Sequence, residues 1–419
     1  MRLKSSPMMF CLTVIALAAF FVGEAWAHPK YKILHAFTGG DDGGGLFGSL
    51  VLDKSGNLYG ITRGGGKHIY GLVFELSPSP NGHWKETVLH NFCSVRSKKG
   101  PPLCLDGAGG LAGPVFDPAG NLFGATTTGG SYNQGVVFQL TKTRGVWKYK
   151  IILEGGTGLG WATDSAGNLY GYYGPGQYHD GAVAELSHRA DGWTDKALYS
   201  FDFGKGHDGW GIESGFNFDS TGNLYGTTEY GGSGGFGTAF EVSPPDPLGT
   251  QDEWQEHILH QFPAFQGDGE YPYAGLIADK AGNVYGATES GGACYPCGTI
   301  FELSPGSDGT WQETILHKFS NPSDGTGPLG TLVFDGAGNL YGTTLSDGAQ
   351  QYCDGGCGVV FKLTPEGQGK WKYTVLHRFK GSDGAAPWAA LILDSKGNLY
   401  GTTQYGGSGT AGVAFEITP

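Results

Sequence analysis

The sequence Gly-Asn-Leu-Tyr-Gly stands at residues 56–60 and recurs unchanged at 167–171, 222–226, 338–342 and 397–401. Two further copies differ at one position, with Phe for Tyr at 120–124 and Val for Leu at 282–286. The seven copies are 47 to 64 residues apart and extend over most of the chain. A repeat of about this length is typical of solenoids and propellers, in which each repeat is one supersecondary unit.

Each repeat contains four short runs rich in β-branched and aromatic residues, separated by Gly, Pro, Asp and Ser. In the fifth repeat these runs, named A to D, cover residues 273–279, 283–289, 298–304 and 311–319. None of them has the periodicity of a helix. Runs A and B are always joined by Asp-x-x-Gly-Asn, in which Asp accepts backbone N–H groups and Gly adopts a positive φ. The pattern predicts an antiparallel meander of four strands.

Seven such sheets around one axis form a seven-bladed β-propeller. The sequence at 31–37 matches run D, and the chain ends with run C at 412–418. We therefore expect the N-terminal strand to join the C-terminal blade, which would close the ring and remove free strand edges. An open β-solenoid is the alternative, but it needs capping repeats, and the chain has a split repeat instead. The prediction is a single all-β domain over residues 28–419.

The first 27 residues are predicted to be a secretory signal peptide. Arg2 and Lys4 precede an apolar run of about 15 residues, too short to span a bilayer, and Ala-Trp-Ala at 25–27 provides a cleavage site. An uncleaved membrane anchor is the alternative. Loss of Arg2, Lys4 and Glu24 changes the net charge from −13 to −14. Such an acidic protein is a poor partner for nucleic acid.

Six cysteines remain after the signal peptide, in three close pairs: Cys93/Cys104, Cys294/Cys297 and Cys353/Cys357. An even number of cysteines in an exported chain predicts disulfides. The alternative for the last two pairs is a four-thiolate zinc site. Export favours the disulfides.

The repeat resembles the Gloeo/Verruco (GloVer) tandem repeat of exported bacterial proteins. The resemblance is carried by segments 222–230, 298–305, 311–319 and 324–335, and extends over about residues 31–419. It implies no reaction and no catalytic residues. Members of this family often have a C-terminal surface anchor, whereas this sequence ends at Pro419 directly after run C. We therefore expect a secreted or periplasmic monomer without a membrane span.

Candidate binding residues stand six positions before the A–B aspartate, where the repeats differ most. This position holds Phe47, Leu111, Gly158, Glu213, Tyr273, Leu329 and Trp388. If run A lines the channel, then Phe47, Tyr273 and Trp388, with Trp210 nearby, would offer aromatic faces at its mouth for sugar rings. The alternative is packing of the inner strands. Repeat three departs most from the pattern and adds Tyr178, His179 and Asp180 as candidates in its B–C loop.

Two repeated polar positions have structural interpretations. An aspartate in an Asp-Gly pair lies 11 residues before the A–B aspartate in six repeats, and we interpret it as a loop-fixing turn; a Ca²⁺ site is the alternative. Histidines recur in run D, as His35, His90, His260, His317 and His377. We expect them to pack against run C glutamates such as Glu302.

The sequence contains no P-loop, G-x-S-x-G or H-E-x-x-H motif, so no catalytic residue is assigned. We expect an exported binding module for a glycan or a surface protein. One alternative is a hydrolase or lyase that acts on polysaccharide with a cation in the channel. The other is a structural component of the cell surface. No cofactor is expected apart from the Ca²⁺ alternative.

Overall fold

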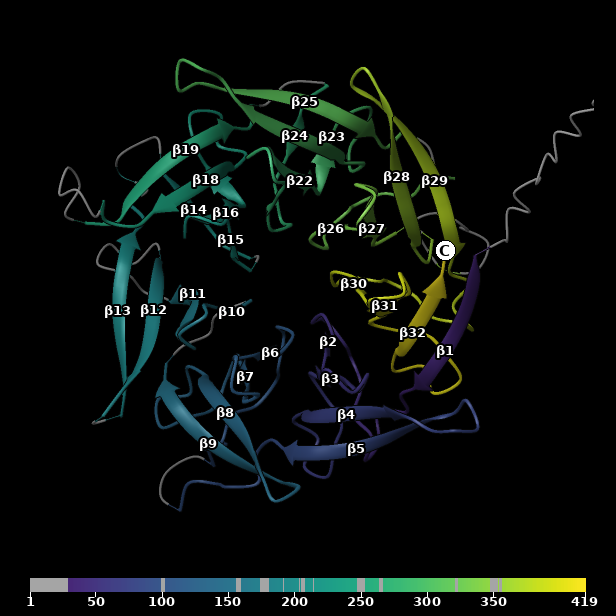
Figure 1. Cartoon of the computed structure of the whole chain (residues 1–419). Helices are drawn as coiled ribbons and strands as arrows, with labels where there is room; N and C mark the ends of the chain where they lie inside the picture. The colour runs from purple at the N-terminus through teal and green to yellow at the C-terminus, as the bar shows by residue number, and fades with distance from the viewer. Residues whose placement is uncertain are drawn as a thin grey trace, which may run out of the picture.

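The computed structural model describes residues 29–98, 102–155, 160–173, 181–190, 192–202, 204, 208–213, 215–246, 253–263, 267–320, 323–346, 353 and 356–419. Seven four-stranded antiparallel sheets lie around a central axis, which confirms the predicted seven-bladed β-propeller (Figure 1). The predicted signal peptide, 1–27, lies outside these residues. No helix in the described part of the chain has the length and apolar character that a membrane crossing requires.

The two inner strands of each blade come from runs A and B. The innermost strands are β2 (Val51–Leu52), β6 (Val115–Phe116), β10 (Ala162–Thr163), β15 (Asn217–Phe218), β21 (Ile277–Ala278), β26 (Val333–Phe334) and β30 (Ile392–Leu393). The second strands are β3 (Leu58–Ile61), β7 (Leu122–Ala125), β11 (Leu169–Tyr173), β16 (Leu224–Thr228), β22 (Val284–Thr288), β27 (Leu340–Thr344) and β31 (Leu399–Thr402). The innermost strands are shorter than run A, because only two residues of each pair with the next strand.

The two outer strands are longer. The third strands are β4 (Leu72–Pro78), β8 (Val136–Thr143), β12 (Ala182–Arg189), β18 (Thr238–Ser243), β24 (Thr299–Pro305), β28 (Val359–Gly367) and β32 (Val413–Thr418). The outermost are β5 (Trp84–Asn91), β9 (Val146–Glu154), β13 (Gly192–Ser200), β19 (Gln255–Gln261), β25 (Trp311–Lys318), β29 (Lys370–Arg378) and β1 (Lys30–Ala36). Four two-residue strands form small ladders in the loops: β14 (Gly209–Trp210) with β17 (Tyr230–Gly231), and β20 (Gly269–Glu270) with β23 (Ser290–Gly291).

The outermost strand of the last blade comes from the N-terminus. β1 pairs antiparallel with β32 over six residue pairs, from Lys30–Thr418 to Ala36–Val413. The two strands lie side by side in Figure 1, where the earliest and latest parts of the chain meet. The first and last segments of the chain therefore share one sheet.

The A–B turns are held by local hydrogen bonds that the sequence pattern predicts. Asp53 Oδ1 accepts the backbone N–H of Asn57 at 2.8 Å, and its Oδ2 accepts the Asn57 side-chain amide at 2.8 Å. Tyr59 then donates its hydroxyl to the same carboxylate at 3.1 Å. Desolvation tends to raise the pKa of Asp53, but these hydrogen bonds outweigh it and hold the pKa below its usual value.

Aromatic residues fill the space between blades, as the repeat predicts. The ring of Tyr59 on β3 lies edge to face with Phe116 of the next blade, at 5.1 Å, and with Trp147 at 5.8 Å. The glycine after the recurrent tyrosine allows a phenylalanine of the third strand to lie against the backbone. A Cβ at Gly286 would lie 2.5 Å from Cζ of Phe301, so only glycine fits there.

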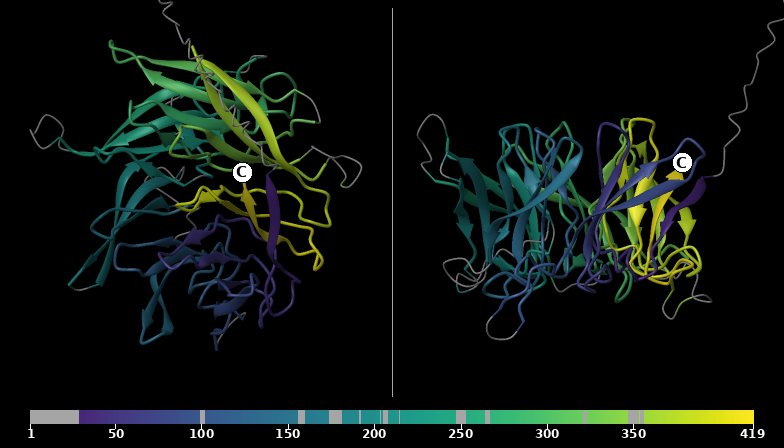
Figure 2. Two further views of the ribbon diagram at one scale, coloured as in Figure 1. Left: turned by 45° about the vertical axis from the view of Figure 1, so that its right-hand side comes forward. Right: turned by 90° about the horizontal axis from the view of Figure 1, so that it is seen from below.

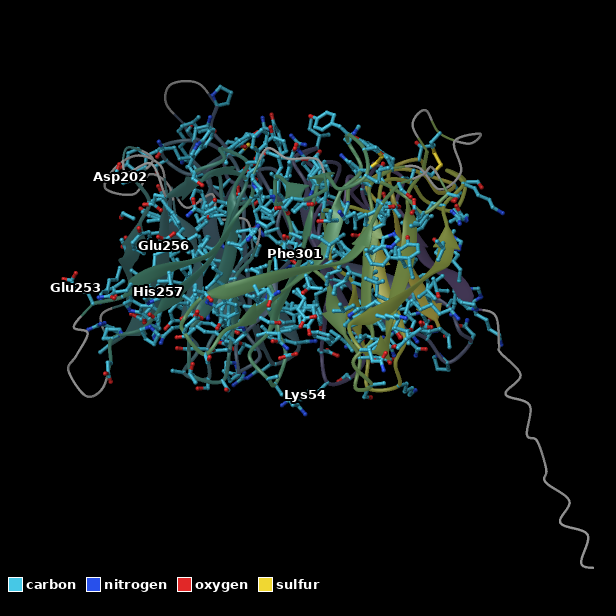
Figure 3. The ribbon with its side chains drawn as sticks, turned by 90° about the horizontal axis from the view of Figure 1, so that it is seen from above. Lys54, Asp202, Glu253, Glu256, His257 and Phe301 are labelled. Carbon is cyan, nitrogen blue, oxygen red and sulfur yellow. A yellow bond between two sulfur atoms is a disulfide. The ribbon has the colours of Figure 1, made fainter. Side chains whose placement is uncertain are left out.

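The hairpin turns and the long connections lie on opposite faces of the ring. The face that carries the D–A and B–C connections, such as 37–50 and 62–71, is called here the loop face. The other carries the A–B and C–D hairpins and is called the turn face. Figure 3 shows this division: Lys54 of an A–B turn and Asp202 of a D–A connection project from opposite edges. The edge-on view in Figure 2 shows the longer loops gathered on one side.

Candidate functional site

The variable position of the repeats lines one cavity at the axis. All six of its described members contribute to a cavity of about 300 Å³ on the loop face. They are Phe47, Leu111, Glu213, Tyr273, Leu329 and Trp388. This cavity and its six residues are called here the channel mouth. Its size lies at the lower end of the range for small-ligand sites. The seventh member, Gly158, lies outside the described residues.

Threonine hydroxyls from neighbouring blades hold the backbone beside each aromatic residue of the channel mouth. Each lies on the second strand of one blade and donates to a carbonyl of the next. The three bonds are Thr402 Oγ1 to Gly48 O at 3.2 Å, Thr227 Oγ1 to Ala274 O at 3.0 Å, and Thr343 Oγ1 to Ala389 O at 3.3 Å. Residues 48, 274 and 389 directly follow Phe47, Tyr273 and Trp388. The blades that precede Leu111 and Leu329 have Ile61 and Ala287 in place of threonine.

Three aromatic rings from three blades meet at the channel mouth. Trp388 lies edge to face with Phe47, with ring centroids 5.8 Å apart, and with Tyr273, at 5.6 Å. All three side chains are partly exposed. Edge-to-face contacts of this kind stabilise by about 0.5–1.5 kcal/mol beyond burial, so they hold the rings in a defined arrangement. Three of the four predicted aromatic residues therefore line one cavity.

Charged groups of opposite sign border these rings. Tyr273 donates its hydroxyl to Glu213 Oε2 at 3.2 Å. Burial, and then the charge of Glu229, raise the pKa of the Glu213 carboxyl, and the hydrogen bond from Tyr273 partly opposes them. The guanidinium of Arg63, also at the cavity, lies 5.1 Å from the centroid of the Phe47 ring. The channel mouth thus combines apolar faces with an acid and a cation.

A second variable position of the repeats lies beside the D–A connections and was not among the predicted site residues. It lies three residues after the last glycine of Gly-Asn-Leu-Tyr-Gly, and its described members are Arg63, Thr127, Glu229, Glu289, Leu345 and Gln404. The backbone N–H of each donates to a carbonyl of its blade's D–A connection, as Glu289 does to Tyr271 O at 2.9 Å. The same alignment of repeats contained this signal, because the position varies as strongly as the first.

The channel mouth continues into a groove between the last and first blades. Phe47 and Arg63 line both, and Gln404 and Tyr405 line the groove alone. The Gln404 amide donates to the Tyr405 hydroxyl at 2.9 Å, and Tyr405 is 55% exposed. An extended ligand that entered the mouth would find further aromatic and polar contacts here.

Trp210 does not line the channel mouth. It lies farther out on β14 and is 40% exposed. Its ring stacks on Tyr230 with centroids 4.4 Å apart, and Tyr230 in turn contacts Tyr271 edge to face at 5.6 Å. These residues form a separate aromatic group on the loop face. The candidates Tyr178, His179 and Asp180 lie outside the described residues.

The three predicted disulfides are present, each within one loop of the loop face: Cys93–Cys104, Cys294–Cys297 and Cys353–Cys357. The four-thiolate zinc alternative is therefore wrong. Each bond closes a loop of 3 to 11 residues of sequence separation. The bonds hold single connections and do not link blades.

The recurrent histidines lie at the boundaries between the outermost strands of neighbouring blades, called here the outer seams. Each Nε2 lies 3.0 to 3.7 Å from the aspartate of the following Asp-Gly pair. The pairs are His35–Asp42, His90–Asp106, His260–Asp268, His317–Asp324 and His377–Asp383. The expected contact with run C glutamates is wrong: Glu302 accepts the Ser304 hydroxyl at 3.1 Å instead. The D–A connection turns back beside the histidine, so its aspartate is the nearer carboxylate.

These aspartates also fix the loops, as their interpretation as turn residues predicts. Asp106 accepts the backbone N–H groups of Ser94 and Val95, both at 3.0 Å. In one blade Tyr199 replaces the histidine and donates to Asp208 at 3.0 Å. In another, Leu153 stands at the histidine position and the connection that follows has no Asp-Gly pair. The blade that lacks the histidine therefore also lacks the aspartate that would face it.

One outer seam should make stability depend on pH. Burial, and then the charge of Asp42, raise the pKa of Glu86 to about 7. The unfolded chain ionises this group near its ordinary value, so its contribution is present at low pH and is lost as pH rises toward 7. We expect Glu86→Gln to gain about 1–2 kcal/mol relative to wild type between pH 5 and pH 8, allowing for solvent exposure. Urea unfolding at several pH values measures it.

The matched control for this prediction is Glu302→Gln. Glu302 is also a partly buried strand glutamate, and its carboxylate accepts the Ser304 hydroxyl. The pH-dependent change that belongs to the outer seam is the part that Glu86→Gln shows and Glu302→Gln does not. If the difference between Glu86→Gln and wild type did not change with pH, the raised pKa would be contradicted.

Seven blades around a central channel, with a cavity at one end, define the class of β-propeller proteins. Within this class the chain belongs to the Gloeobacter/Verrucomicrobia repeat family, whose family model matches residues 111–352 and 250–419. The expected family is therefore confirmed. A search of curated proteins found no match.

Solved structures resemble the chain in fold alone. One is an oxidoreductase described as a glucose dehydrogenase, from Thermus thermophilus, with 15% identity and a TM-score of 0.42 over 73% of this chain and 95% of that one. Another is a luciferin-regenerating enzyme, with 14% identity and a TM-score of 0.44 over 73% of this chain and 90% of that one. At these values neither resemblance indicates an activity.

Proposed function

We propose that the protein is an exported binding module that recognises a polysaccharide at the channel mouth. The observation that carries this proposal is the meeting of Phe47, Trp388 and Tyr273, from three different repeats, around one cavity. Partly exposed rings offer flat apolar area to the C–H face of a sugar, and polar groups beside them bind its hydroxyls. Glu213 and Arg63 are such groups, one on each side of the rings.

Export is supported by the N-terminal sequence and by the disulfides. Residues 1–27 have the charged start, apolar run and cleavage site of a signal peptide. Three disulfides within loops are stable in an oxidising compartment and are rare where thiols are kept reduced. A polysaccharide of the cell surface or its surroundings is a ligand that such a compartment supplies.

The first experiment is a glycan-array scan of residues 28–419, with and without Ca²⁺, followed by titration with the polysaccharide class that binds. We expect Trp388→Ala to weaken binding by at least about 30-fold, since a central aromatic contact is commonly worth 2 kcal/mol or more. The matched control is Tyr132→Ala, which removes an aromatic side chain that is 74% exposed in a B–C loop and does not line the channel mouth. This variant should bind as wild type does.

Two outcomes would contradict the proposal. A blank array with a folded protein would remove the glycan as ligand and would direct the search to a surface protein. Equal loss of affinity in Trp388→Ala and Tyr132→Ala would show that binding is not centred on the channel mouth. Circular dichroism of each variant confirms that the fold is retained.

One observation favours a second candidate, an enzyme that cleaves the bound polysaccharide. The raised pKa of Glu213 suits a general acid, and the hydroxyl of Tyr273 lies within hydrogen-bond distance of it. If the channel mouth is catalytic, Glu213→Gln should abolish release of fragments while binding changes by less than about threefold. If wild type releases no fragments from a polysaccharide that it binds, the enzyme is excluded for that ligand.

A further inference from the structure

One outer seam differs from the others in a way that the loop-fixing role of its aspartate does not explain. The common arrangement is found at three other seams, where a tyrosine of the next outermost strand stacks on the histidine. Tyr373 stacks on His317 in this way, with centroids 4.1 Å apart and planes 6° from parallel. The Tyr373 hydroxyl donates to the Asp324 carbonyl. The equivalent pairs are His90–Tyr149 and His377–Tyr31. Tyrosine therefore fits this position well.

Between β19 and β25 a glutamate takes the place of that tyrosine. Glu313 lies across the seam from His260, and Asp268 comes from the connection before β20. The Nε2 atom of His260 is 3.7 Å from Asp268 Oδ2 and 3.8 Å from Glu313 Oε2, both too long for hydrogen bonds. At this seam the histidine therefore has a second carboxylate, that of Glu313, where three other seams have a stacked tyrosine ring.

Two atoms of this group are buried without a hydrogen-bond partner among the described residues: His260 Nε2 and Glu313 Oε1. A buried polar atom without a partner costs about 1–3 kcal/mol. Burial, with the charge of Asp268, also raises the pKa of Glu313 to about 7, although His260 opposes this. Unpartnered atoms also occur at His317 Nε2 and, between β1 and β5, at His35 Nε2 and Glu86 Oε1. What distinguishes the seam between β19 and β25 is that a ligand atom from each of two acids and an imidazole lies within 4.8 Å of the other two.

The spacing of these atoms suits a metal ion. One ligand atom from each of the three side chains lies within 4.8 Å of the other two. Zinc–nitrogen and zinc–oxygen bonds are about 2.0–2.2 Å long, so two ligand atoms of one ion lie at most about 4.4 Å apart. The 3.7 and 3.8 Å distances from His260 Nε2 to the two carboxylate oxygens are within this limit. The three side chains are 14 to 20% exposed, so an ion and a water ligand can enter from the outside.

We propose that His260, Asp268 and Glu313 bind one divalent transition-metal ion of the Zn²⁺ class across the seam between β19 and β25. One imidazole and two carboxylates form a ligand set that Zn²⁺ accepts, whereas Ca²⁺ prefers oxygen ligands alone. The ion would neutralise both carboxylates and would give His260 Nε2 its missing partner. It would also link two blades that no disulfide joins within the described residues.

The seam between β1 and β5 provides a matched comparison. It also holds His, Asp and Glu, as His35, Asp42 and Glu86. There both Asp42 oxygens accept hydrogen bonds from Thr38, the backbone N–H at 2.9 Å and the hydroxyl at 2.5 Å. In contrast, the bond from Gly269 N–H goes to Asp268 Oδ1, and Oδ2 lies on the His260 side. We expect no ion between β1 and β5.

The test is isothermal titration of Zn²⁺ into chelator-treated residues 28–419 without an affinity tag. We expect one site per chain, and Glu313→Tyr should weaken it at least about 100-fold. This variant copies the His317–Tyr373 seam, so it should fold. Glu86→Gln, the matched control, should bind Zn²⁺ as wild type does.

Thermal unfolding provides a second measurement. Saturating Zn²⁺ should raise the Tm of wild type and of Glu86→Gln and leave that of Glu313→Tyr unchanged, because an ion that binds only the folded state stabilises it. If folded wild-type protein binds no Zn²⁺, or if Glu313→Tyr binds it with unchanged affinity, the proposal is overturned. Neither result depends on a ligand at the channel mouth.

Discussion

Removal of residues 28–38 is expected to abolish cooperative unfolding of the propeller or to make the protein oligomerise. This deletion removes β1, which supplies the outermost strand of the last blade through six residue pairs with β32. It would expose the edge of β32, and exposed strand edges pair with other chains. The deletion therefore opens the ring where the N-terminal strand completes the last blade.

The deletion also removes side chains that pack into two neighbouring blades. Leu34 and Phe37 are buried, and each contributes about 1.5–3 kcal/mol by burial. Tyr31 stacks on His377 of the preceding blade, with centroids 3.8 Å apart, and donates its hydroxyl to the Asp383 carbonyl at 2.5 Å. Since whole domains are stable by only about 5–15 kcal/mol, these losses are a large part of the total.

Urea unfolding followed by fluorescence and by circular dichroism, together with sedimentation, measures this effect. The two probes should give separate transitions in the deletion variant and a single transition in residues 28–419. The control is a chain that lacks only residues 28 and 29, which precede β1. If the deletion variant were monomeric and melted as the full mature protein does, the ring would not depend on β1.

Replacement of Phe301 by alanine should destabilise the protein by about 3–5 kcal/mol, the usual cost of emptying a buried phenylalanine site. Phe301 on β24, labelled in Figure 3, is fully buried and lies opposite Gly286 in the sheet. Its ring also meets Phe262 of the preceding blade edge to face at 5.3 Å. Alanine would therefore leave a cavity that backbone on one side and a rigid ring on the other cannot fill.

Urea unfolding at constant pH measures the change in the free energy of unfolding. The control is Tyr295→Ala in the same blade, because Tyr295 is 74% exposed and should change stability by less than about 0.5 kcal/mol. Comparable losses in both variants would contradict the claim that Phe301 packs in the core. A loss below about 1 kcal/mol in Phe301→Ala would do so as well.

Contacts within a repeat could be predicted because the residues that make them recur with few changes in all seven copies. The A–B turn depends on hydrogen bonds between residues two to six positions apart, as from Asp53 to Asn57 and Tyr59. The pairing of Gly286 with Phe301 likewise follows from the order of strands within one meander. The number of blades follows from the number of copies. The candidate residues of the channel mouth could also be found, because the position six residues before the A–B aspartate differs among repeats whose other positions recur.

Contacts between blades could not be read from the chain. The innermost strands keep only two paired residues because the chain must converge toward the axis, and so residue 273 lies at a cavity rather than in a strand. Trp210 and Tyr273 look equivalent as aromatic candidates, but the loop ladder of β14 and β17 holds Trp210 away from the mouth. The packing of neighbouring blades decides which of them reaches the axis.

The sequence alone therefore specifies the β-propeller, its seven blades and its hairpin turns, since each rests on a pattern within one repeat. The tertiary structure alone decides the partners of the histidines, the meeting of Trp388 with Tyr273, and the group formed by His260 and Glu313. Residues 260 and 313 lie on β19 and β25, in different repeats, and their distance depends on how two twisted sheets pack around the axis. No periodicity along the chain encodes that distance.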